Sequence, residues 1–170
     1  PSKANKKAKK AKIDKKVTID GKEYAVTAIA VGAFSGNTKM TSISIPTTVT
    51  KIGKNAFKFC TKLETQHSLI KKEEIKSVEV NEMEVIGDYA FQGCTALPAI
   101  ALPESVNSIG TNAFSACHAL NSVVIPNNVA KINNRAFAYC SALTNVILSE
   151  SLTEIGQYAF SCCTSLPSII

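Results

Sequence analysis

Six cysteines and two histidines are the residues of this 170-residue chain with the greatest potential for chemistry. A zinc site needs clustered Cys and His ligands at short spacings, and a catalytic thiol needs a histidine within reach. His118 directly follows Cys117, but consecutive residues of a regular coil point in different directions. His67 has no second histidine beside it, and there is no Cys-x-x-Cys motif. The sequence therefore predicts no metal site, no cofactor and no enzyme.

The spacing of the cysteines indicates a structural role. Five of them stand three residues after a phenylalanine: Cys60, Cys94, Cys117, Cys140 and Cys163. Cysteines at one position of successive coils point inward in a row, as small buried apolar groups do. Parallel side chains would hold neighbouring Cβ atoms roughly 5 Å apart, beyond the ~3.8 Å of a disulfide. We therefore expect buried free thiols instead of a disulfide framework, with Cys162 exposed and reactive.

These cysteines belong to a 23-residue repeat. The phenylalanine of an Ala-Phe pair recurs at positions 34, 57, 91, 114, 137 and 160, with one step of 34 residues. Val123 and Ile125 alternate with outward neighbours and precede Pro126, which predicts a short strand. The apolar residues within 136–143 have spacings of 1, 4 and 7, typical of one face of a helical turn. Each unit should therefore contain one strand and one short helical or 3₁₀ segment.

Stacking of such units predicts a solenoid. One unit cannot bury its apolar face alone, whereas neighbours share a core with strands about 4.8 Å apart in a parallel ladder. The residue after the second isoleucine of the unit is Asn133 in one copy and glycine in four: Gly53, Gly87, Gly110 and Gly156. Because asparagine tolerates positive φ better than most residues, we expect a tight left-handed turn at this position.

The positive charge is concentrated at the N-terminus. Residues 1–16 hold eight lysines and one acid, so the rest of the chain carries about −1 of the net charge of +6. Such a lysine-rich segment is typical of a flexible linker, or of an electrostatic anchor for an anionic polymer or surface. This distribution removes the main argument for a nucleic-acid partner. The chain also has no apolar run of about 18 residues that would cross a membrane.

Two further segments frame the repeats. Residues 17–36 contain Asp20-Gly21 between two strand-like runs, which predicts a hairpin that caps a first partial repeat. Residues 37–170 then form the repeats, with an 11-residue insertion within 64–85. This insertion is either a longer coil or a functional surface loop. The last residues read as a strand without a polar cap, which implies further repeats or pairing of this edge with another molecule.

The repeat resembles the bacterial surface leucine-rich repeats called BspA-like, whose units look like Ile-Gly-x-x-Ala-Phe-x-x-Cys-x-x-Leu-x-x-Ile-x-Ile-Pro. The match extends roughly from Ile29 to Ile170. The resemblance implies an α/β fold, a right-handed solenoid with parallel strands on the concave face and short helical or 3₁₀ segments on the convex face. It also implies an extracellular or cell-surface, non-enzymatic protein that adheres to host matrix proteins or other cells.

A strip of outward-facing strand residues is the candidate protein-binding surface. It comprises Ser42, Ser44, Ala99, Ala101, Ser122, Val124, Asn145 and Ile147. A small, uncharged and increasingly apolar strip can accept an extended chain or a flat protein surface, or can simply ease curvature. Two functions therefore stay open, an adhesion or protein-binding module and a structural spacer with no ligand of its own.

Overall fold

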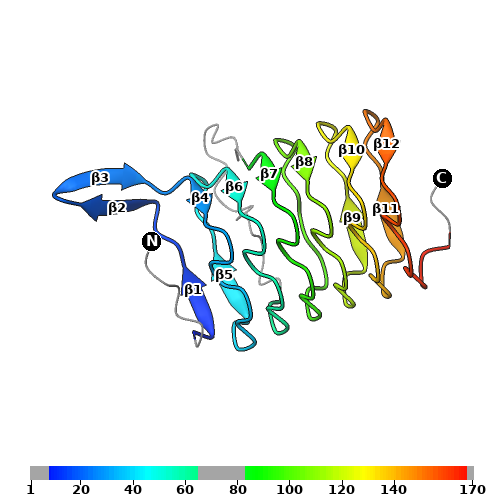
Figure 1. Cartoon of the computed structure of the whole chain (residues 1–170), viewed down its shortest axis with the longest axis horizontal. Helices are drawn as coiled ribbons and strands as arrows, with labels where there is room; N and C mark the ends of the chain where they lie inside the picture. Colours follow the sequence, from blue (N-terminus) through cyan, green and yellow to red (C-terminus); the bar gives the residue numbers. More distant parts are fainter. Residues whose placement is uncertain (1–7, 65–82, 168–170) are drawn as a thin grey trace, which may run out of the picture.

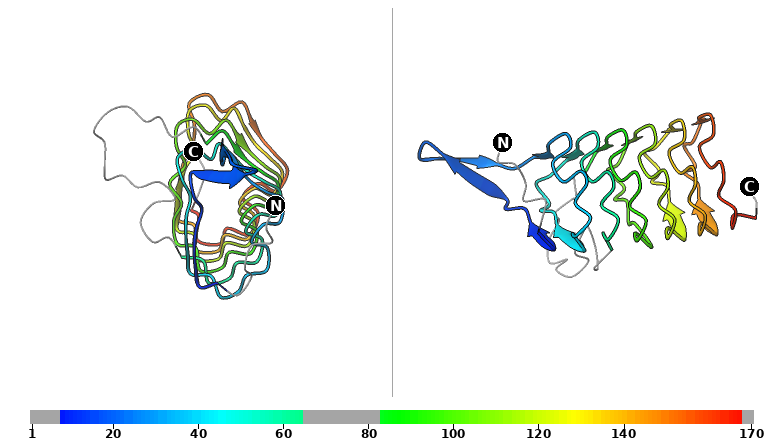
Figure 2. Two further views of the ribbon diagram at one scale, coloured as in Figure 1. Left: turned by 90° about the vertical axis from the view of Figure 1, so that its left-hand side faces the viewer. Right: turned by 60° about the horizontal axis from the view of Figure 1, so that its bottom comes forward.

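The computed structural model describes residues 8–64 and 83–167 as a stack of coils with a hairpin at one end (Figure 1). Seen end-on, successive coils overlie one another (Figure 2). The strands are short: β1 (Lys10–Lys12), β2 (Lys16–Ile19), β3 (Lys22–Ala25), β4 (Ala28–Ile29), β5 (Ser42–Ser44), β6 (Lys51–Ile52), β7 (Val85–Ile86), β8 (Ser108–Ile109), β9 (Ser122–Val124), β10 (Lys131–Ile132), β11 (Asn145–Ile147) and β12 (Glu154–Ile155).

Two parallel ladders run along the stack. The longer one joins six strands in the order β12-β10-β8-β7-β6-β4, with inward isoleucines in register, such as Ile52 with Ile86. The other is represented by the pairs β1-β5 and β9-β11, and by a bridge between Ala99 and Ser122. The predicted parallel solenoid is therefore confirmed, but each complete coil has a second strand where the sequence predicted the start of a helical segment.

The described residues contain no helix, so the predicted helical or 3₁₀ segments are wrong. The segment after the second strand is instead a series of turns. Asn55 and Phe59 have φ of 57° and 58°, and such left-handed residues interrupt any right-handed helix. Alternate amides donate to the next coil at 2.7–2.9 Å: Asn55, Phe57 and Phe59. The amides between them close turns on the carbonyl three residues earlier, which reproduces the spacing of three that suggested a helix.

The repeated glycine is explained by close approach of two coils. Gly53, Gly87, Gly110 and Gly156 lie outside the positive-φ region, so the predicted left-handed turn is wrong at this position. A Cβ at Gly110 would lie 2.5 Å from the amide nitrogen of Asp88 and 2.6 Å from the carbonyl carbon of Gly87. Glycine therefore avoids a clash at these four positions, because the preceding coil's backbone occupies the space of a side chain.

We expect Gly110→Ala to lower the free energy of unfolding by about 2–3 kcal/mol, because the methyl group meets backbone that cannot move aside. Urea denaturation followed by circular dichroism measures this loss. Asn133→Ala is the matched control, since this position in the next coil already accommodates a Cβ. It removes only the bond from Asn133 Nδ2 to the Ile109 carbonyl (2.7 Å), which should cost about 1 kcal/mol. Equal losses in the two variants would contradict the close-approach explanation.

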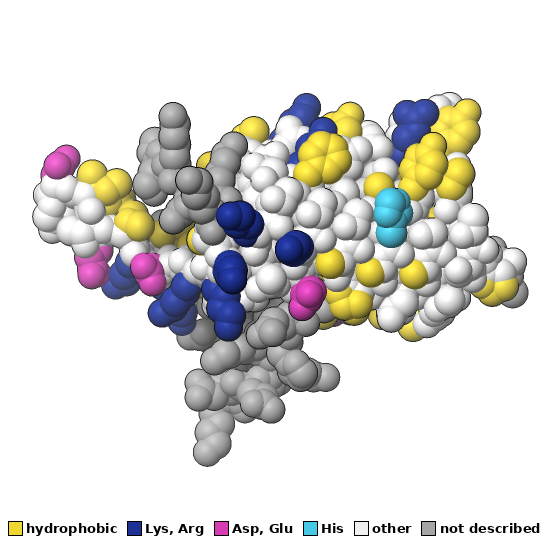
Figure 3. Space-filling model, turned by 90° about the horizontal axis from the view of Figure 1, so that it is seen from below, with side chains coloured by type: hydrophobic (Ala, Val, Ile, Leu, Met, Phe, Trp, Pro, Cys, Tyr) yellow, Lys and Arg dark blue, Asp and Glu magenta, His cyan; other side chains and the backbone are white. Residues whose placement is uncertain are grey.

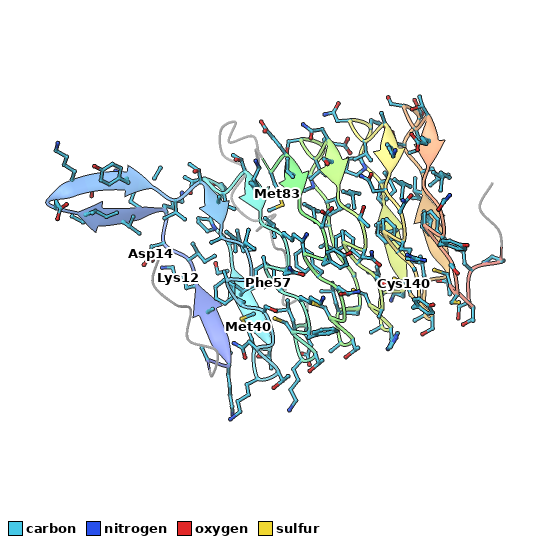
Figure 4. All side chains as sticks on the ribbon, in the orientation of Figure 1. Lys12, Asp14, Met40, Phe57, Met83 and Cys140 are labelled. Atoms are coloured by element: carbon cyan, nitrogen blue, oxygen red, sulfur yellow. The ribbon has the colours of Figure 1, made fainter. Side chains whose placement is uncertain are left out.

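A continuous aromatic stack forms the centre of the core. The rings of Phe34, Phe57, Phe91, Phe114, Phe137 and Phe160 follow one another with centroids 5.1–5.4 Å apart and planes within 3–17° of parallel. Met40, Phe57 and Cys140 lie inside the stack of coils, whereas Lys12 and Asp14 lie at its outer surface (Figure 4). Each coil buries its phenylalanine together with several aliphatic side chains, and this burial is the main source of stability.

The insertion does not disturb this stack. Residues 65–82, which contain most of the predicted insertion, lie outside the described residues. On either side of them the coils remain in register, since Ile52 pairs with Ile86 and the rings of Phe57 and Phe91 are 5.1 Å apart. A 34-residue unit thus adds the same step along the array as a 23-residue unit.

The N-terminal part differs from the prediction of a flexible linker over residues 1–16. Within that segment β1 pairs in parallel with β5, and Ala11 and Ile13 pack against the core. The lysines alternate with these apolar residues, so Lys10 and Lys12 face outward while the stretch completes an additional coil edge. Its predicted linker character therefore does not hold for β1.

The predicted hairpin is present, but it does not cap the first coil. β2 and β3 pair antiparallel around Asp20 and Gly21, whose φ values of 50° and 74° fit a type I′ turn. The hairpin projects beyond the stack of coils (Figure 2, right), and all of its strand residues are exposed. The first coil is instead covered in part by β1, through its pairing with β5.

Candidate binding surface

The predicted strip lies along the shorter ladder. Ser122 and Asn145 are paired across β9 and β11, and so are Val124 and Ile147. The structure thus brings these four residues together, with Ala99 bridged to Ser122. Val124 and Ile147 are 51% and 52% exposed, although both are large and apolar. Two neighbouring apolar side chains therefore stand free on this face.

The first two residues of the strip lie apart from these residues. Ser42 and Ser44 belong to β5, where their partners are Lys10 and Lys12 of β1. Residues 65–82 fall in sequence between β5 and the coil that contains Ala99 and Ala101, and they lie outside the described residues. The described strip therefore consists of a lysine-flanked serine pair and a separate, more apolar section.

Sequence reasoning missed a second exposed feature on the turn side of the coils. Phe59, Tyr139 and Tyr158 are exposed and have positive φ, which bulky residues rarely adopt. Cations lie over two of these rings, with Lys58 Nζ 5.1 Å from the Phe59 centroid and Arg135 Cζ 5.0 Å from the Tyr158 centroid. Their only signal in the sequence is an aromatic residue two before or two after the core phenylalanine.

The cysteine row is buried and satisfied, as its spacing predicted. Each buried thiol donates to the carbonyl of the core phenylalanine in the preceding coil at 3.1–3.3 Å: Cys60, Cys94, Cys117, Cys140 and Cys163. All six cysteines are free, and Cys162 is the exposed one. The reactivity of Cys162 stays a prediction.

Burial also suppresses ionisation of four of these thiols. It raises the pKa of Cys60 to about 11 and that of Cys117 to about 12, and it raises the pKa of Cys94 as well. A hydrogen bond with Cys163 and burial raise the pKa of Cys140. Since the thiolate is the nucleophile and the metal ligand, these protonated thiols serve as donors in the core.

The remaining polar groups form no recognisable reaction centre in the described ranges. His118 is exposed beside the buried Cys117, so the two side chains point apart. In residues 8–64 and 83–167, no three His, Cys, Asp or Glu side chains are grouped so that they could hold a metal ion. The same residues include no helix long and apolar enough to cross a bilayer.

Comparison with known proteins places this arrangement among bacterial repeat proteins. A family model of the BspA type leucine rich repeat region matches residues 13–77 and 66–170, in six copies. A leucine-rich repeat protein from Bacteroides ovatus is 36% identical, with a TM-score of 0.80 over 92% of this chain and 38% of its own. A leucine rich cell surface protein from Faecalibacterium prausnitzii is 30% identical, with a TM-score of 0.78 over 96% of this chain and 47% of its own.

A leucine rich repeat protein of T. pallidum is more distant, at 26% identity and a TM-score of 0.70, over 96% of this chain and 80% of its own. The chain thus spans less than half of the length of the first two relatives. No curated protein matches it.

Proposed function

The chain belongs to the BspA-type leucine-rich-repeat family, and from this premise we propose that it is a protein-binding or adhesion module of a bacterial cell surface. Leucine-rich repeats commonly bind proteins and are generally not enzymes. The relative from Faecalibacterium prausnitzii, described as a cell surface protein, supports an extracellular location. The observation that carries the proposal is the pair of exposed apolar side chains, Val124 and Ile147, in register on neighbouring strands.

The chemistry of this section fits a host matrix or cell-surface protein better than a small molecule. Its side chains are apolar or small and uncharged, and Val124 and Ile147 are half exposed on the paired strands β9 and β11. A flat, apolar strip of this kind suits an extended peptide segment or a flat protein surface. Because the apolar residues are few, we expect an affinity that depends strongly on each of them.

The test is retention of the array by a panel of immobilised extracellular-matrix proteins, measured by biolayer interferometry. Val124→Glu should reduce binding at least ten-fold, because a buried unpaired carboxylate costs well over 1.4 kcal/mol. Ala101→Glu changes the exposed residue of the strip in an earlier coil and should also weaken binding. Tyr139→Ala removes an exposed aromatic residue from the turn side and should leave it unchanged. If only Tyr139→Ala weakens binding to the matrix proteins, the binding surface is the turn side of the coils.

A structural spacer is the second candidate, and the continuous phenylalanine stack favours it. The stack and the coil-to-coil hydrogen bonds extend through all the described repeats and make the array stiff along its length. A spacer needs no ligand of its own. If no matrix protein retains the array, while grafting it between two domains holds them at a fixed separation, the spacer function replaces the binding function.

We also propose that the edge of the last described coil pairs with a strand or coil of another molecule. In the preceding coil, the amides of Arg135, Phe137 and Tyr139 donate to the next coil. The equivalent amides of Tyr158 and Phe160 have no acceptor among the described residues. This edge therefore offers donors at the spacing that a following coil requires.

A further inference from the structure

The projecting hairpin has one apolar and one polar face. Because paired residues of an antiparallel ladder share a face, Val17 and Tyr24 stand together, with Ile19 beside them. These side chains are 44%, 50% and 55% exposed for Val17, Tyr24 and Ile19. Nothing in the described part of the chain covers them. A two-stranded hairpin is at best marginally stable alone in water, so such a face is unfavourable unless something covers it.

The opposite face is polar, and its charged side chains form an ion pair with each other. There Lys16 Nζ lies 2.8 Å from Glu23 Oε2, and Thr18 is the cross-strand partner of Glu23. On the apolar face the partner of Ile19 is Lys22, whose long stem can lie along the isoleucine while its ammonium group reaches outward. The apolar face is thus bordered by a cation.

Lysines lie along the hairpin and in strand β1 that precedes it. Residues 8–25 contain six lysines and three acids. Two of those acids are within 4.0 Å of a lysine, Asp14 beside Lys12 and Glu23 beside Lys16. Figure 3 shows hydrophobic side chains on the hairpin and lysines gathered over the adjoining first coils on one side of the molecule. Apolar and cationic groups are therefore presented together.

Charge is also segregated along the whole array. Residues 8–64 carry eleven lysines and four acids, whereas residues 83–167 carry two basic and five acidic residues. A negatively charged surface would therefore attract the hairpin end and repel the far end. A second copy docked through the same face would bring two positive ends together, which argues against self-association.

From this combination we propose that the β2–β3 hairpin and the lysines around it dock on an anionic lipid bilayer, with the apolar face lying in the interface. The apolar side chains Val17, Ile19 and Tyr24 enter the headgroup region, and Tyr24 supplies the amphipathic ring that favours this depth. The lysines provide the electrostatic attraction, each worth roughly five-fold in the partition coefficient near an anionic surface. The repeats then extend away from the bilayer with their strip accessible.

The experiment uses the full chain with Tyr24→Trp, which introduces the only tryptophan of the sequence. Vesicles of phosphatidylglycerol and phosphatidylcholine should shift its fluorescence to the blue, and vesicles of phosphatidylcholine alone should not. Tyr158→Trp, at the far end of the array, should show no shift with either. Sodium chloride at about 0.5 M should largely abolish the shift, because it shortens the screening length well below that of 0.1 M salt.

Side-chain variants separate the lipid surface from other anionic partners. Ile19→Ser in the Tyr24→Trp background should lower vesicle partitioning about ten-fold, and Ile19→Leu should preserve it. The hairpin makes no core contact through Ile19, so the array stays folded in both variants. Absence of vesicle binding by the parent protein overturns the proposal. The proposal is also overturned if Ile19→Ser does not weaken vesicle binding and the protein binds dextran sulfate equally well. A soluble anionic polymer would then be the partner.

Discussion

Replacement of Phe114 by alanine should lower the free energy of unfolding by about 3–5 kcal/mol, the range for removal of a fully buried phenylalanine. Phe114 lies in the middle of the aromatic stack, between Phe91 and Phe137 at 5.2 and 5.3 Å. Its removal creates a cavity that the flanking coils cannot close, because their positions are fixed by hydrogen bonds to both neighbours. Urea denaturation followed by far-ultraviolet circular dichroism provides the measurement.

Two further aromatic-to-alanine variants serve as controls for this loss in free energy of unfolding. Phe160→Ala affects a half-buried ring with a single neighbour in the described stack and should cost about half as much, roughly 2 kcal/mol. Tyr139→Ala removes an exposed aromatic side chain and should stay within about 0.5 kcal/mol. A similar loss in Phe114→Ala and Phe160→Ala would mean that the stack does not stabilise the array through its neighbours on both sides.

Alkaline pH should destabilise the protein through its buried thiols. Burial holds the pKa of Cys60 at about 11 and that of Cys117 at about 12, against 9.0 for the unperturbed thiol. Below pH 9 both states are protonated and the stability contribution is complete. Above pH 9 the unfolded state loses protons that the native state retains, so stability falls as pH rises towards 11–12. Each such thiol removes about 1.4 kcal/mol per pH unit.

The contribution of one thiol is isolated by Cys117→Ser. Serine keeps a donor for the Phe91 carbonyl, which Cys117 Sγ contacts at 3.2 Å, but it does not ionise in this range. The free energy of unfolding of this variant, measured in urea at pH 7, 9, 10 and 11, should decline less steeply than that of the parent by about 1.4 kcal/mol per pH unit above pH 9. If the free energies of unfolding of the parent and of Cys117→Ser decline equally with pH, ionisation of tyrosine and lysine side chains causes the decline.

The period and the core could be predicted from the sequence because identical positions of stacked units must meet. The residue types of Phe57, Cys60 and Leu63 recur in every unit after the first, and repetition alone requires them to share an interior. The helix was wrongly predicted because a spacing of three residues is common to helical turns and to consecutive β-turns. What decides between them is the positive φ of residues such as Phe59 and Tyr139, and neither residue type favours it. Hydrogen bonds from one coil to the next hold that conformation.

At the N-terminus, composition concealed a local pattern. Lysine abundance predicted a linker, but Lys10-Ala11-Lys12-Ile13 alternates polar and apolar residues, the pattern of a half-buried strand. The hairpin could be predicted from Asp20-Gly21, but the sequence did not indicate that it projects beyond the stack of coils. Alternating Val17 and Ile19 normally indicate a buried face, and only the arrangement of the first coil shows that this face has no partner within the described residues.

The exposure of the predicted strip could be predicted only in part, and its binding role stays a proposal. The alternation of Ser122 and Val124 with the buried Val123 predicted their outward direction, because a strand presents every second residue to one side. The exposed aromatic residues of the turn side carried no such signal. Their exposure depends on left-handed backbone at Tyr139 and Tyr158. Interaction surfaces formed by turns are therefore harder to predict than those formed by strands.

The even spacing of the phenylalanine rings means that the length of the array increases in equal steps. Every unit advances the array by one ring separation, 5.1–5.4 Å, whether it has 23 residues or 34. Gain or loss of a whole unit would change the length of the array by one ring separation. Every ring and thiol would still pack against an equivalent neighbour. Length can therefore vary in fine steps among such proteins without any redesign of the interior.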